Sequence, residues 1–186
     1  KDVYEAELAY ENNEMSLHTR IILPASSIPS PLYNYTNKNT TQEEHEALKA
    51  KDEEVRKNYY VLTTYGKIIF NSMFPEGIPF VCEASAKNLT YGINDRFLIK
   101  KGSNFKEEIS KWLTEGEARR QGISLDAPNV LPHPFKKKFL EVIIAEVFKE
   151  YKLAETSRTL DRMKDLGFKY STVSGITVSA YDIKVV

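Results

Sequence analysis

The strongest structural signal in the chain is the segment Phe139-Leu140-Glu141-Val142-Ile143-Ile144-Ala145-Glu146-Val147-Phe148. Its apolar residues recur every three or four positions and form one broad stripe, which is typical of a helix that packs on one side against a core. The pattern predicts a helix over about 135–151. A chain with such a helix and only short β-prone runs elsewhere is expected to have an α+β fold, with mixed helices and small sheets.

A second helix is predicted to begin at about Ala154. Gly167 stands where a left-handed residue closes a helix, and Phe168 is placed to contact Met163, as in a Schellman cap. We therefore expect the helix to end just before Gly167. The residues expected to face inward are Leu153, Leu160, Met163 and Leu166. The segment 175–179 is β-prone.

The chain before this helical pair alternates between short elements and polar segments. Thr41 and Glu44 form a capping-box signature at the start of a solvated surface helix that runs to Lys57. Thr63 or Thr64 is expected to cap the next helix. The other predictions are a helix at 3–12, strands at 15–23, 59–62 and 97–99, a loop at 24–40, a turn at 75–79, irregular backbone at 85–104, a short helix at 107–113 and a polar insertion at 114–134.

The composition and charge of the chain limit the classes of function that it can have. The 186 residues are 41% hydrophobic and 28% charged, which is ordinary globular composition for one large domain or two small ones. Lys plus Arg and Asp plus Glu both number 26, so any contact with nucleic acid would need a local basic patch. No apolar run approaches the roughly 20 residues of a membrane span, so we expect no membrane partner. The N-terminus has neither Met nor a signal-like segment, and we expect a piece of a longer protein.

Catalytic and metal-binding motifs are absent from the sequence. The single cysteine, Cys82, has an apolar context and is expected to be an idle buried thiol in a reducing compartment. His18, His45 and His133 lack ligand spacing, and no serine-hydrolase elbow, phosphate loop or Asp-x-Asp-x-Asp cluster occurs. We expect no catalytic residue and no metal site. Three glycosylation triplets, at Asn34, Asn39 and Asn88, are expected to be unmodified. Lys136-Lys137-Lys138 is expected to lie on a solvated face, although cations are disfavoured at a helix N-terminus.

Several blocks of the sequence resemble one family in the same order along the chain. The longest runs from Leu160 to Thr172, followed by Ser174 to Val178 and Asp182-Ile183. The others are Glu5-Ala6 to Ala9-Tyr10, Leu17-His18-Thr19-Arg20, Thr63-Thr64-Tyr65-Gly66-Lys67-Ile68-Ile69-Phe70-Asn71, Phe74-Pro75, Pro79-Phe80, Asn88-Leu89, Asp95-Arg96-Phe97 and Pro134-Phe135-Lys136-Lys137. Together they resemble the beta-prime subunit of bacterial DNA-dependent RNA polymerase, in the form found in low-GC Gram-positive bacteria.

The resemblance implies a position within a transcription enzyme. Residues 1–186 would form the pore, or secondary-channel, segment, with 24–58 and 114–134 as variable loops or insertions. The family's catalytic loop, Asn-Ala-Asp-Phe-Asp-Gly-Asp, does not occur in the chain, so this piece of a nucleotidyltransferase is expected to be inert alone, with Mg²⁺ bound outside it. The implied partners are the beta, alpha, omega and sigma subunits, template DNA and RNA, in the cytoplasm.

Within that frame the candidate residues are few. Lys67, Lys164 and Lys169 are expected to tune the electrostatic field along the nucleotide path. Thr63, Thr64, Gly66, Gly77, Gly167 and Gly175 are expected to form caps and tight turns. Two alternatives remain open: a free-standing interaction module derived from the same fold, and a small enzyme whose polar groups gather only in the folded chain.

Overall fold

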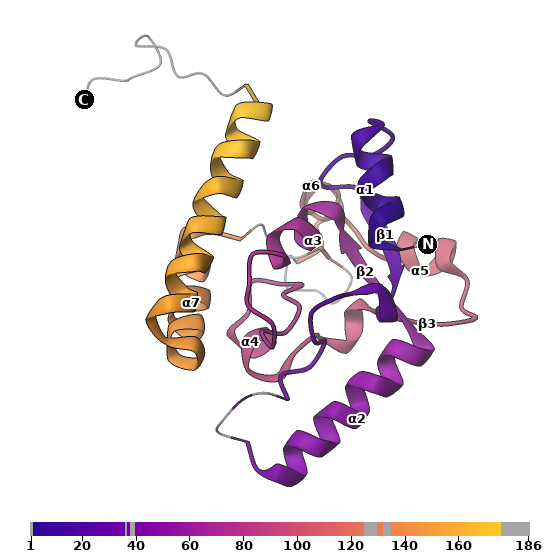
Figure 1. Cartoon of the computed structure of the whole chain (residues 1–186). Coiled ribbons are helices and arrows are strands. Elements are labelled where there is room, and N and C mark those ends of the chain that lie inside the picture. Colours follow the sequence, from indigo (N-terminus) through magenta and orange to yellow (C-terminus); the bar gives the residue numbers. More distant parts are fainter. Residues whose placement is uncertain (1, 36, 38–39, 125–129, 132–134, 176–186) are drawn as a thin grey trace.

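The computed structural model describes residues 2–35, 37, 40–124, 130–131 and 135–175 (Figure 1). Helices and a small three-stranded sheet make up this part of the chain, which confirms the predicted α+β class. The α-helices are α1 (Val3–Glu11), α2 (Gln42–Asn58), α3 (Tyr65–Asn71), α4 (Ala86–Tyr91), α5 (Phe105–Ser110), α6 (Glu115–Arg120) and α7 (Lys137–Val173). The strands are β1 (Arg20–Pro24), β2 (Tyr59–Thr64) and β3 (Leu98–Lys100), and two 3₁₀ turns are η1 (Ala25–Ser27) and η2 (Asp95–Phe97).

The sheet is antiparallel with β2 in the centre. Ile22 of β1 lies opposite Leu62, and Leu98 of β3 lies opposite Val61. The strand predicted at 15–23 is wrong in its first half, because the backbone N–H of Ser16 donates to the Thr19 hydroxyl at 2.9 Å and residues 16–19 turn. Local hydroxyl-to-backbone bonds of this kind compete with strand pairing.

The predicted surface helix is confirmed as α2. Thr41 and Glu44 form both bonds of the capping box, and the helix runs along one side of the molecule (Figure 1). Most of its side chains are exposed, but Asp52 and Val55 are buried. The prediction of a solvated surface helix is therefore confirmed, except that Asp52 and Val55 are buried.

Two segments predicted to be irregular or inserted contain short helices. Within 85–104, the Ser85 hydroxyl accepts a bond from Lys87 N and starts α4, and Gly92 ends it with φ +110°. Within 114–134, Thr114 and Glu117 form a second capping box at the start of α6. Both helices have six residues, which is too short for apolar periodicity to reveal them. The short helix expected at 107–113 lies slightly earlier, as α5.

The helical pair predicted from 135 onward is present, with one correction. The segment Lys137–Val173 is divided at Lys152, whose φ of 62° and ψ of −163° are not helical. The second half does not end before Gly167 but continues to Val173, so the Schellman cap is wrong and Phe168 is 68% exposed. The penalty of one glycine inside a helix is only about 1 kcal/mol, so Gly167 does not by itself end the helix. Of the β-prone segment predicted at 175–179, residues 176–179 lie outside the described residues.

Two apolar clusters hold these elements together. The larger one joins the sheet, α1, α3 and the loop before α2, and includes Leu32, Leu62, Phe80 and Phe97. The smaller one joins α7 to the loop after α3, where Phe139, Ile143 and Val147 pack on Met73 and Phe74, with Met163 and Leu166 at its edge. Both halves of α7 thus contact the body of the molecule through the second cluster. Among the described helices none is long and apolar enough to cross a membrane.

Candidate functional site

The junction between β2 and α3 holds most of the residues singled out from the sequence. Thr64 caps α3, because its hydroxyl accepts a hydrogen bond from Lys67 N at 3.3 Å. Thr63 is not the cap: it lies within β2, and its buried hydroxyl has no partner among the described residues. Gly66 N donates to Leu17 O at 3.0 Å, and a Cβ on Gly66 would lie 2.9 Å from that oxygen. Glycine is required here by close backbone approach inside a helix rather than by a tight turn.

Lys67 points its ammonium group toward an aromatic pair. Its Nζ lies 5.4 Å from the centre of the Phe97 ring, which stacks on Trp112 at 5.2 Å. Among the described residues no carboxylate lies within ion-pair distance of Lys67. Desolvation lowers the pKa of this ammonium, and Glu83 opposes the shift only in part. Lys67 is therefore a partly buried cation held by ring contacts rather than a solvated surface charge.

A pocket of about 410 Å³ opens beside this junction. Its walls come from residues 17–18, the end of β2, α3 and the start of α6, and Leu131 and Phe135 complete the lining. The lining is mostly apolar, with His18, Lys67 and Glu115 as its charged or ionisable members. These groups come from separate elements and form no ion pair or hydrogen bond with one another among the described contacts, so they do not constitute an acid–base pair.

Lys164 and Lys169 lie elsewhere, on the second half of α7. Lys164 Nζ is 3.4 Å from Asp161 and 3.8 Å from Asp165 in exposed ion pairs. Lys169 Nζ lies 5.7 Å from the Tyr170 ring and borders a shallow depression with Ser72 and Arg162. The structure thus does not bring the three predicted lysines to one site, since Lys67 of α3 lies against the Phe97 ring while Lys164 and Lys169 lie on the second half of α7.

The remaining predicted turns have mixed outcomes. Gly77 and Gly175 take positive φ angles of 99° and 61°, as a tight turn requires. Gly167 does not, because it lies inside the helix, and a Cβ added there would meet nothing within 4 Å. The prediction that Gly167 caps the helix is therefore wrong.

No catalytic constellation is found in the part of the chain that the structure describes. No group of three His, Cys, Asp or Glu residues there could hold a metal ion. Cys82 is buried as expected, and desolvation raises the pKa of its thiol to about 12, so the nucleophilic thiolate is absent at neutral pH.

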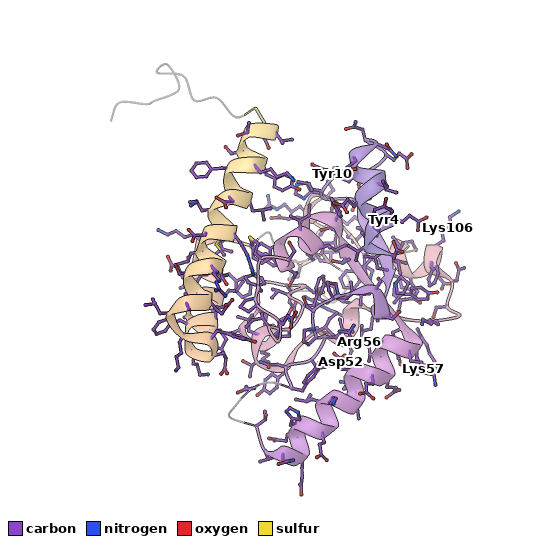
Figure 2. All side chains as sticks on the ribbon, viewed as in Figure 1. Tyr4, Tyr10, Asp52, Arg56, Lys57 and Lys106 are labelled. Carbon is purple, nitrogen blue, oxygen red and sulfur yellow. The ribbon has the colours of Figure 1, made fainter. Side chains whose placement is uncertain are left out.

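Sequence reasoning missed a buried ion pair on the inner face of α2. Asp52 Oδ1 accepts from the backbone N–H groups of Leu32 and Tyr33 at 2.6 and 3.2 Å, and Oδ2 pairs with Arg56 Nε. Arg56 in turn donates to Ile28 O at 2.8 Å and Ser30 O at 2.6 Å. Both side chains lie on the side of α2 turned toward the body (Figure 2). Their i, i+4 spacing was visible in the sequence, but exposed pairs with that spacing are common.

Two buried asparagines were missed as well. Asn71 Oδ1 accepts from Val81 N at 2.7 Å, and Asn88 Oδ1 accepts from Cys82 N at 2.8 Å. The amide groups of both also donate to main-chain oxygens, so residues 80–83 are held without a neighbouring strand. Asn88 is 1% exposed, which agrees with the expectation that its triplet is unmodified.

The fold and these contacts define a mixed helix-and-sheet segment in which buried polar side chains bind the backbone of the chain's own loops. The chain belongs to the family described as RNA polymerase Rpb1, domain 3, whose model matches residues 1–183. This confirms the resemblance stated from the sequence blocks.

Relatives of known name agree with the family match. The chain is 43% identical over 185 residues to the DNA-directed RNA polymerase subunit beta' of Bacillus cytotoxicus, covering all of this chain and 12% of that protein. It is 42% identical over 181 residues to the same subunit of Acholeplasma laidlawii, covering 97% of this chain and 10% of that protein. The subunit of Bacillus anthracis is 41% identical. The chain therefore spans about a tenth of the length of these relatives.

Proposed function

We propose that this chain is a structural segment of a bacterial DNA-directed RNA polymerase, within the beta-prime subunit, and that it lines the secondary channel through which nucleotides enter and backtracked RNA leaves. The observation that carries the proposal is the match of nearly the whole chain, at 40–43% identity, to beta-prime subunits. In this proposal the catalytic Mg²⁺ and the reacting groups belong to other parts of the subunit, and the chain works in the cytoplasm together with the beta, alpha, omega and sigma subunits, template DNA and RNA.

The internal contacts support a scaffold role. Four polar side chains form hydrogen bonds with backbone atoms of the same chain: Asp52, Arg56, Asn71 and Asn88. Cys82 is held as a neutral thiol by burial. A channel wall needs a fixed shape and a favourable field rather than reactive groups, and such a field can be supplied by exposed lysines.

The proposed field can be tested in the assembled polymerase. Lys164 and Lys169 are exposed on one helix, so replacing both with alanine leaves the core contacts intact. We expect the apparent KM for nucleotides to rise about two- to fivefold at low salt and to return toward the unmodified value at high salt, because salt screens exposed charges. Lys67→Met tests the third candidate separately, since it also removes a partly buried contact.

The control is Lys49→Ala on α2, an exposed lysine on a different helix. It should leave the KM unchanged at every salt concentration. An equal KM for the double variant, the control and the unmodified enzyme at low salt would contradict a channel role for the α7 lysines.

A further inference from the structure

Lysines and aromatic rings form a patch where the end of α2 meets the turn between β3 and α5. Lys101 Nζ donates a hydrogen bond to Lys57 O and lies 5.7 Å from the centre of the Tyr60 ring. The Tyr60 ring packs edge-to-face with Phe105, and the two ring centres are 4.7 Å apart. Lys106 follows Phe105 in α5. These contacts connect residues 57, 60, 101, 105 and 106, which we call the β3–α5 patch.

The three lysines of the patch are exposed, and none forms an ion pair with a carboxylate of the described residues. Lys57 follows Glu53 by four positions, a spacing that often gives an ion pair on a helix, but none forms here. Figure 2 shows Lys57 and Lys106 on the same side of the molecule. Ammonium groups without an internal counter-charge attract an anionic partner from outside the chain.

The local charge balance differs from that of the whole chain. The chain as a whole carries no net charge, so contact with nucleic acid requires a local basic excess. The segment 100–111 contains four lysines and two glutamates, and Lys57 adds another positive charge from α2. The β3–α5 patch therefore supplies the excess that the overall composition lacks.

An accessible aromatic ring indicates which kind of anion fits. Phe105 remains 37% exposed although its ring packs with Tyr60. Surfaces that bind single-stranded nucleic acid combine cations for the phosphates with aromatic rings on which bases stack. A duplex keeps its base faces covered, and the carboxylates of an acidic peptide would satisfy the lysines but not the ring.

We propose that the β3–α5 patch binds a single strand of nucleic acid. Lys57, Lys101 and Lys106 contact phosphates, and Phe105 stacks on a base. Each phosphate contact on a single strand contributes about −0.7 to the slope of log K against log salt concentration, so three contacts contribute about −2. This inference goes beyond the proposed channel role and does not depend on it, because the patch and the α7 lysines lie on different elements.

Fluorescence anisotropy tests the patch in polymerase elongation complexes, in which the enzyme's own template and transcript positions are already filled. The probes are labelled oligouridine and oligothymidine of about 20 nucleotides, longer than the stretch that one such surface covers. Replacing the three lysines with alanine should weaken binding about tenfold or more at low salt and make the salt slope shallower by about 2. Phe105→Leu keeps an apolar contact for Tyr60 and should weaken binding about fivefold or more without changing the slope, because stacking is not ionic.

Two controls separate charge from folding and from position. Replacing the same three lysines with arginine keeps the charges and should retain binding. Lys87→Ala removes an exposed lysine on α4 and should leave both affinity and slope unchanged. The ratio of the two probe affinities tells whether RNA or DNA is preferred, and either preference supports the inference.

Two results overturn the inference. One is equal affinity of the triple alanine variant and Lys87→Ala. The other is unchanged affinity in Phe105→Leu, which would favour an acidic protein partner instead. The KM measurement on Lys164 and Lys169 reports on a different helix, so the two proposals fail separately.

Discussion

Asp52 of α2 holds the loop that runs from η1 to Tyr33, and replacing Asp52 should detach this loop from the helix. Asp52 is 3% exposed, and it accepts two backbone hydrogen bonds while neutralising Arg56. Asp52→Ala would leave the N–H groups of Leu32 and Tyr33 without their acceptor and Arg56 without its counter-charge. We expect the free energy of unfolding to fall by about 3 kcal/mol, since bonds to a charged group contribute about 1.5–3 kcal/mol each and breaking a buried pair costs about 3–5 kcal/mol.

That magnitude lies at the lower end of the range because Arg56 keeps its bonds to Ile28 O and Ser30 O and its side chain is 25% exposed. Asp52→Asn should cost less, about 1 kcal/mol, because the amide oxygen still accepts from both N–H groups. Asp161→Ala, at an exposed pair on α7, is the matched control and should change stability by less than about 0.5 kcal/mol.

Urea unfolding of the 186-residue chain measures the global change, and amide hydrogen exchange measures the local one. With a slope of about 2 kcal/mol per molar urea, the midpoint for Asp52→Ala should fall by about 1.5 M. Exchange at the Leu32 and Tyr33 amides should accelerate more than at Ile22 in β1. A midpoint equal to that of Asp161→Ala, or unchanged exchange at both amides, would refute the assignment of Asp52 as the residue that holds this loop.

Three further outcomes are expected from the same unfolding measurement. Lys152→Gly should raise the free energy of unfolding by about 1 kcal/mol, because φ 62° with ψ −163° is a glycine conformation. The control, Lys149→Gly within the helix, should lower it by about 1 kcal/mol. A loss of stability in both variants would show that the Lys152 backbone is not strained. Gly66→Ala should lower the free energy of unfolding by about 1–3 kcal/mol, because the new Cβ would lie 2.9 Å from Leu17 O. The control, Gly116→Ala, adds its Cβ in open space and should not lower stability. Equal effects would argue against the close approach at Gly66. Burial raises the pKa of the Cys82 thiol from 9.0 to about 12, so its contribution to stability is full below pH 9 and is lost as the pH rises toward 12. In Cys82→Ala the free energy of unfolding should therefore decline less steeply in that window, by up to about 1.4 kcal/mol per pH unit. Identical slopes for the two proteins would contradict the shift.

Features that depend on residues close together in the chain could be predicted from the sequence. The apolar stripe at 139–148, the capping box at Thr41 and the β-prone run at 59–62 each specify local structure through contacts within a few positions, and α7, α2 and β2 follow them. The family was likewise readable, because ordered blocks along the chain carry it without any knowledge of the fold.

The roles of the buried polar residues became visible only in the folded chain. Asp52 and Asn88 look like ordinary surface residues in the sequence, yet backbone groups brought in from residues 32–33 and 82–83 make them buried acceptors. Gly167 shows the converse: local rules favoured a cap there, but the helix continues to Val173, and Met163 and Leu166 just before the glycine pack on the second cluster. Burial and partners depend on which distant segments meet, and that information is distributed over the whole chain rather than held in any one motif.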